Sequence, residues 1–211
     1  VARVDGPGVL ELRDEVGDWR DFGLLGFALD PDYETNGRFY LSYVVDYHHL
    51  KFFGTPQYDP GADQYFTDTI ARVTRYAANA GDGFRTADLS TRAVLIGESI
   101  TTGIPILHQS HGPGALAFGH DGTLIVSTGD GGSYSVADDG GPNQGSSNTG
   151  LADGIITPDQ DVGAYRAQQI GSLSGKLLRI NPQAGDGVPD NPFFDPALRV
   201  VLTTANNRGA R

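Results

Sequence analysis

The chain has 211 residues, of which 38% are hydrophobic, so it can bury one sizeable core or contribute part of a larger one. Its formal net charge of −11 argues against a nucleic acid or an anionic membrane as a partner, because both attract basic surfaces. The absence of cysteine excludes disulfides and thiolate catalysis. No apolar run reaches the roughly 18 residues needed to cross a membrane.

Two similar series of strands are predicted along the chain. Those of the first series lie near 27–29, 38–43, 70–76 and 92–97. Those of the second series lie near 116–118, 123–127, 175–180 and 199–204. An Asn-Gly or Asp-Gly dipeptide joins the first two strands of each series, and such dipeptides readily adopt the positive φ of tight hairpins. Each series also contains a long polar loop, at 46–68 or at 133–169.

Four antiparallel strands per repeat are typical of the blades of a β-propeller. We therefore predict an all-β chain with blades at about 23–100 and 112–204, and with 1–12 as the outer part of a preceding blade. A propeller ring closes with roughly four to eight blades, so this chain would supply two to three of them. The remaining blades would come from the rest of the protein or from another chain. A self-contained β-sandwich is the alternative.

Three segments are predicted to meet at one end of the propeller channel, because each enters an innermost strand. They are 19–22, 109–112 and 205–208. His111 is the candidate general base, since imidazole exchanges a proton near neutral pH. A structural hydrogen bond to a neighbouring loop is the alternative for His111. Asp130 is either a cation ligand or a residue that bonds its own turn amides. Asp21 is either a site residue or a residue that caps a turn or pairs with Arg20.

Other motifs give weaker indications. The loop after Asp130 has carboxylates of the kind that calcium prefers, but without EF-hand spacing. They are Asp138, Asp139, Asp153, Asp159 and Asp161. No Rossmann fingerprint is present, so an oxidoreductase would need a cofactor other than a Rossmann-bound nucleotide.

The order and spacing of several motifs resemble the glucose/sorbosone dehydrogenase family. Its members include soluble aldose dehydrogenases that depend on pyrroloquinoline quinone (PQQ). The matching segments cover nearly the whole chain, from about 20 to 195, and are 23–33, 36–40, 111–116, 129–132, 172–182 and 190–193.

The resemblance implies a six-bladed propeller, secreted or periplasmic, with PQQ at the channel mouth and calcium beneath it. The implied reaction is oxidation of an aldose sugar or related alcohol. In this reaction His111 takes the proton of the C1 hydroxyl and hydride passes to the quinone. Asp130 is the candidate metal ligand. The other implied site residues are Arg208 for catalysis and Asp21, Ser110, Asn206 and Asn207 for cofactor binding.

Three positions depart from the family pattern. Ser110 stands where Asn or Asp is usual, and Asp21 where Gln or Glu is usual. Residues 206–208 read Asn-Asn-Arg in place of Arg-Asn-Pro. Non-catalytic propellers, including the hedgehog-interacting proteins, share the signature. The alternative functions are therefore a non-catalytic extracellular propeller that binds a protein or glycan partner, and a calcium-dependent lactonase-type hydrolase.

Overall fold

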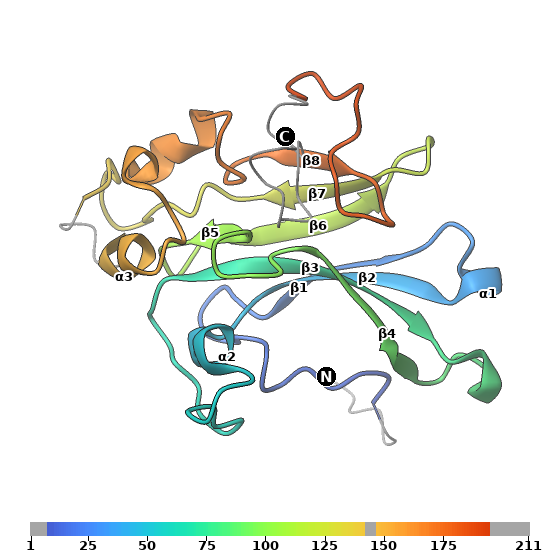
Figure 1. The fold of residues 1–211 in the computed structure, drawn as a ribbon. Coiled ribbons are helices and arrows are strands. Elements are labelled where there is room, and N and C mark those ends of the chain that lie inside the picture. The colour runs from blue at the N-terminus through green and yellow to red at the C-terminus, as the bar shows by residue number, and fades with distance from the viewer. Residues whose placement is uncertain (1–7, 142–146, 195–211) are drawn as a thin grey trace.

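The structure is a computed structural model that describes residues 8–141 and 147–194. Within these residues the chain folds into two antiparallel sheets that lie one above the other (Figure 1). The predicted fourth strand of the second series, at 199–204, lies outside the described residues, as do Asn206, Asn207 and Arg208.

The first sheet is a meander of consecutive strands. They are β1 (Leu24–Leu29), β2 (Arg38–Val44), β3 (Thr69–Ala78) and β4 (Ala87–Ile96). Strand β5 (Ile104–Ile106) pairs with the start of β3, so that β4 and β5 share one edge of that strand. The predicted Asn-Gly turn contains the short helix α1 (Tyr33–Asn36), which ends at Gly37 with a φ of 65°.

The second sheet is also a meander. It contains β6 (Pro113–Phe118), β7 (Leu124–Thr128) and β8 (Leu177–Ile180). The turn between β6 and β7 holds Gly122 at a φ of 75°, as the Asp-Gly signal predicts. The strands β1 to β4 and β6 to β8 lie within the two predicted blade ranges, whereas β5 lies between these ranges and was not predicted. The blade boundaries themselves stay a prediction.

The two long loops contain helices that the prediction of plain polar loops did not include. The first holds α2 (Tyr47–Phe52), whose N-terminus is capped by Asp46, because its carboxylate accepts from the His48 backbone N–H at 2.8 Å. The second holds α3 (Ser147–Ala152) and the 3₁₀ turns η3 (Pro158–Gln160) and η4 (Gly163–Gln168); a further turn, η1 (Ala80–Asp82), precedes β4. Within the described ranges no helix is long and apolar enough to span a membrane.

The sheets meet where their first strands lie against each other. A side chain at Gly26 of β1 would place its Cβ 2.6 Å from the Gly114 carbonyl oxygen of β6, so only glycine permits this approach. Further out, the Tyr40 and Phe118 rings meet edge to face with centroids 5.2 Å apart. Consecutive strands stay in one sheet, as in propeller blades and unlike a Greek-key sandwich. The chain thus has the fold of a partial β-propeller.

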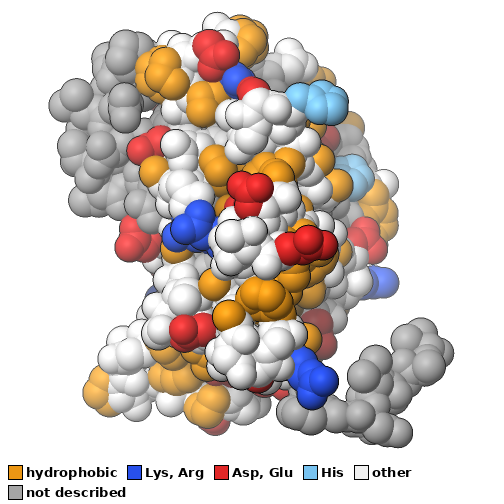
Figure 2. Space-filling view, turned by 90° about the vertical axis from the view of Figure 1, so that its right-hand side faces the viewer, with side chains coloured by type: hydrophobic (Ala, Val, Ile, Leu, Met, Phe, Trp, Pro, Cys, Tyr) orange, Lys and Arg blue, Asp and Glu red, His pale blue; other side chains and the backbone are white. Residues whose placement is uncertain are grey.

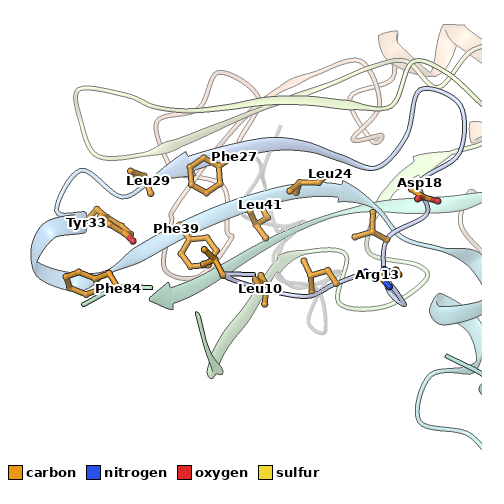
Figure 3. A pocket seen from close by; sticks show the side chains of 13 residues that line it. Leu10, Arg13, Asp18, Leu24, Phe27, Leu29, Tyr33, Phe39, Leu41 and Phe84 are labelled. Carbon is orange, nitrogen blue, oxygen red and sulfur yellow. The ribbon is translucent and has the colours of Figure 1, made fainter. Parts of the chain in front are cut away.

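The other face of the first sheet is only partly covered. The N-terminal segment crosses it, and the Val9 carbonyl accepts from the Ala87 backbone N–H at 2.8 Å. Between this segment and the strands β1 and β2 an apolar groove of about 500 Å³ stays open. The β1 side chains Leu24, Phe27 and Leu29 line this groove (Figure 3). A second sheet packs on one face of the first, and this groove leaves the other face available to a further blade.

The end of the molecule that carries α1 shows no patch of a single charge sign. Acidic and basic side chains alternate there with hydrophobic ones (Figure 2). Arg179, for example, pairs with both Asp121 and Asp190. Those predicted site residues that the structure describes, at 21, 110, 111 and 130, lie at the opposite end, where β1 and β6 begin (Figure 1).

Candidate active site

His111 lies in a sharp turn immediately before β6. Its φ of 57° falls in the left-handed region, which His tolerates better than most bulky residues do. This conformation directs its carbonyl to the Gly131 backbone N–H, which donates at 3.1 Å. A side chain at Gly129 would place its Cβ 2.1 Å from the same carbonyl oxygen. The glycine-rich loop is therefore required for the approach of the two segments.

A carboxylate of that loop orients the imidazole. His111 Nδ1 lies 2.9 Å from Asp130 Oδ1, and this oxygen also accepts from the Gly132 backbone N–H at 2.9 Å. With Nδ1–H donating to the carboxylate, Nε2 keeps its lone pair and can take a proton from a ligand. The side chains of His111 and Asp130 are 46% and 34% exposed, so a ligand can reach the imidazole.

Of the two interpretations that the sequence left open for Asp130, the structure shows the hydrogen bond to its own turn. In addition Asp130 is the partner of His111, which the sequence analysis did not foresee. No group of three or more His, Cys, Asp or Glu residues that would hold a metal ion occurs among residues 8–141 and 147–194. Metal binding by Asp130 stays a prediction.

Two of the three segments predicted to converge do meet. The Arg20 Nε donates to Gln109 Oε1 at 3.0 Å, across the gap between the first and second sheets. The Phe22 ring lies against Gly112, where an added Cβ would come within 3.1 Å of it. The third segment, 205–208, is outside the described residues.

The other predicted cofactor ligands take different positions. Asp21 is exposed in the turn that the Phe22 N–H closes by donating to the Trp19 carbonyl at 3.1 Å. Ser110 is buried, and its hydroxyl lies 3.5 Å from the Gly132 carbonyl and 3.2 Å from His108 Nδ1. Their contacts with a cofactor stay predictions.

His108 differs from His111 in its surroundings. Its ring is half-buried and packs edge to face on Tyr134, with centroids 5.2 Å apart. Burial lowers the pKa of His108, with Asp138 opposing this shift and His111 adding to it. These contacts give His108 a packing role.

The acidic loop surrounds a buried arginine that the sequence analysis missed. Arg166 of η4 is buried, and its Nε donates to the Gln160 carbonyl at 2.8 Å. Burial lowers the pKa of Arg166, and the nearby carboxylates of Asp138 and Asp161 oppose that shift. Asp153 instead pairs with Lys51 at 2.9 Å. Three of the candidate calcium ligands thus lie near a positively charged side chain of the protein: Asp138 and Asp161 near Arg166, and Asp153 near Lys51. The sequence carries no signal for the burial of Arg166, because it follows no apolar periodicity.

The described residues thus form part of a β-propeller, with a histidine–aspartate pair at the end of the sheets where β1 and β6 begin. The chain belongs to the glucose/sorbosone dehydrogenase family, whose model matches residues 8–202. This confirms the resemblance carried by the motifs.

The chain spans about a fifth of the length of the curated relatives that it matches here. It is 29% identical over 143 residues to the HIPL2 protein of Arabidopsis thaliana, a match that covers 60% of this chain and 20% of the plant protein. The PQQ-bound aldose sugar dehydrogenase of Streptomyces coelicolor is 23% identical, with 86% of this chain and 36% of that chain covered and a TM-score of 0.49. The soluble aldose sugar dehydrogenase of Escherichia coli in the apo-form is 20% identical. That match covers 93% of this chain and 39% of the other, with a TM-score of 0.46.

Proposed function

We propose that this chain carries the general base of a quinone-dependent dehydrogenase that oxidises an aldose sugar or a related alcohol. The carrying observation is the pair formed by His111 Nδ1 and Asp130 Oδ1, 2.9 Å apart at an accessible end of the two sheets. Membership of the glucose/sorbosone dehydrogenase family supports the reaction class.

In this proposal a substrate hydroxyl donates to His111 Nε2 and transfers its proton there as the carbon is oxidised. Asp130 holds the ring in the productive tautomer and stabilises the imidazolium that forms. A positioned general base of this kind contributes roughly 10²- to 10⁴-fold in rate. PQQ, when bound, would supply the acceptor for the hydride.

The proposed cofactors are PQQ and calcium. Because no three His, Asp or Glu side chains gather among the described residues, Asp130 would need further ligands from other parts of the ring. The predicted contacts of Asn206, Asn207 and Arg208 with PQQ belong to the same proposal. The location that goes with it is secreted or periplasmic.

A non-catalytic extracellular propeller that binds a protein or glycan partner is the second candidate. Ser110 favours it, because its hydroxyl is buried and bonded within the protein instead of facing the channel end. Such a propeller would keep the fold and lose the cofactor.

The test uses the full-length protein loaded with PQQ and calcium. We expect His111→Ala to lose roughly 10²- to 10⁴-fold in kcat toward aldoses while the protein remains folded. His120→Ala, at an exposed position in the β6–β7 turn, is the matched control and should retain the activity. An equal loss from His108→Ala and His111→Ala would indicate a structural role of the turn. If the wild-type protein binds no PQQ and oxidises no sugar, the binding propeller replaces the enzyme.

A further inference from the structure

Three side chains form a hydrogen-bonded rim beside His111. They are Arg20 from the turn before β1, Gln109 from the turn before β6, and Tyr134 from the loop after β7. Gln109 Oε1 accepts from Arg20 Nε at 3.0 Å, and Gln109 Nε2 donates to the Tyr134 hydroxyl at 3.0 Å. Because both the oxygen and the nitrogen of the Gln109 amide are bonded, the orientation of the amide is fixed. The two bonds also connect the three segments to one another.

The rim is close to the proposed base. Gln109 precedes His111 by two residues, so their Cα atoms are at most about 7 Å apart. Tyr134 follows Asp130 by four residues in the same loop, and its ring packs on His108. The rim is therefore within reach of a ligand that is larger than one sugar ring and has its reacting hydroxyl at His111 Nε2.

The rim offers two kinds of contact that suit a carbohydrate, an exposed aromatic ring and free hydrogen-bond donors. The Tyr134 side chain is 56% exposed and presents an aromatic ring next to solvent. Arg20 uses its Nε toward Gln109, which leaves the two Nη groups of an exposed guanidinium as donors. A pyranose ring offers an apolar C–H face for the aromatic ring and hydroxyl oxygens at its edge for these donors.

We propose that the rim binds the sugar unit next to the one that is oxidised, so that the preferred substrate is a reducing disaccharide or a longer oligosaccharide. This proposal rests on the dehydrogenase function proposed above. Tyr134 stacks on the second ring and the Arg20 Nη groups donate to its hydroxyl oxygens, while Gln109 holds Arg20 and Tyr134 in place. The three residues act in specificity and do not take part in the proton transfer.

The test compares glucose with maltose as substrates of the full-length protein loaded with PQQ and calcium. We expect Tyr134→Ala to lower kcat/KM for maltose roughly threefold to tenfold more than for glucose. A change of this size corresponds to the loss of one aromatic contact. Gln109→Ala should shift the ratio in the same direction, because it breaks both bonds of the rim. Tyr165→Ala, a control at a position 60% exposed, should leave the ratio unchanged.

A wild-type-like maltose-to-glucose ratio in Tyr134→Ala and Gln109→Ala would overturn the rim proposal while the dehydrogenase proposal stands. If no sugar is oxidised at all, the dehydrogenase proposal fails, and binding of maltose is then measured directly by saturation-transfer NMR. Weaker transfer to maltose in Tyr134→Ala than in Tyr165→Ala supports the subsite, and equal transfer in the two variants refutes it.

Discussion

His111 combines a backbone conformation with positive φ and a side chain that is bonded to the Asp130 carboxylate. Non-glycine residues with positive φ are uncommon, and they persist where the surrounding structure determines them. Here the determinants are the Gly131 N–H, which bonds the His111 carbonyl, and the Gly129 N–H, which donates to the Gly112 carbonyl at 2.8 Å. The geometry of the proposed base is therefore set by backbone contacts of the loop that also supplies Asp130.

The glycine at 129 should consequently be indispensable. A Cβ at this position would lie 2.1 Å from the His111 carbonyl oxygen, so Gly129→Ala has to push the two segments apart. We expect a loss of stability of roughly 1–3 kcal/mol, measured by urea unfolding of the full-length protein, and a fall in activity. Gly171→Ala is the matched control, since nothing lies within 4 Å of the added Cβ. Equal stability of the two variants would contradict the close approach.

Among the elements, the N-terminal segment is attached to the first sheet by a buried charge network. Glu15 Oε1 accepts from Tyr43 of β2 at 2.6 Å, Arg72 of β3 at 2.6 Å and Arg92 of β4 at 2.7 Å. Burial would raise the pKa of Glu15, but the two guanidinium groups and the tyrosine hydroxyl outweigh it and lower the pKa below 4.5. One carboxylate thus joins three neighbouring strands to the segment that borders the groove.

Removal of the Glu15 charge should lower the free energy of unfolding substantially. Glu15→Gln leaves two buried or half-buried arginines without their counter-ion, and breaking a buried pair costs roughly 3–5 kcal/mol. The measurement is urea unfolding at pH 7. Glu11→Gln, which removes an exposed pair with Arg13, should change the unfolding free energy by less than about 0.5 kcal/mol.

The same network predicts a pH dependence. Because the folded-state pKa of Glu15 is lowered, its contribution is fully present above the unfolded pKa, near 4.5, and is lost as the pH falls through the folded pKa. The stability of the wild-type protein should therefore decrease more steeply below pH 4.5 than that of Glu15→Gln, and the two should converge in acid. Parallel curves for the two proteins would show that Glu15 is not paired in the native state.

At the scale of the whole molecule, the two sheets represent only a part of a propeller. One face of the first sheet packs on the second sheet, whereas Phe27 on the other face is 58% exposed in the open groove. Sheets of a propeller pack on both faces, so further blades are required to bury such side chains.

This incomplete burial leads to a prediction for the full-length protein. We expect Phe27→Asp to destabilise it by about 2 kcal/mol or more, because a further blade would bury this side chain against the groove. Leu89→Asp is the control: Leu89 is 65% exposed on β4, the last strand of its meander, and its substitution should cost less than about 0.5 kcal/mol. The comparison is made by thermal unfolding, and similar small shifts for both variants would place Phe27 at a free surface.

Local signals in the sequence determined the strands of the two meanders and their turns, whereas β5 was not predicted. Alternating apolar residues and the dipeptides at Asn36 and Asp121 predicted the meanders, because strand pairing and tight turns depend on neighbours in the chain. The helices α2 and α3 were missed, since short helices in polar loops are stabilised by caps such as Asp46 and by packing, not by periodicity. His111 was found as a candidate because an isolated histidine next to a glycine-rich strand entry is visible in the sequence.

The partners of these residues were decided only by the tertiary structure. The pairing of His111 with Asp130, the bond from Arg20 to Gln109 and the burial of Arg166 join residues that are separate in the sequence. Their distances depend on how the two sheets stack and on the close approach at Gly26 and Gly129, which no local pattern encodes. The sequence by itself determined the strand order and the candidate base, whereas the packing of the sheets decided which carboxylate orients that base and which side chains surround it.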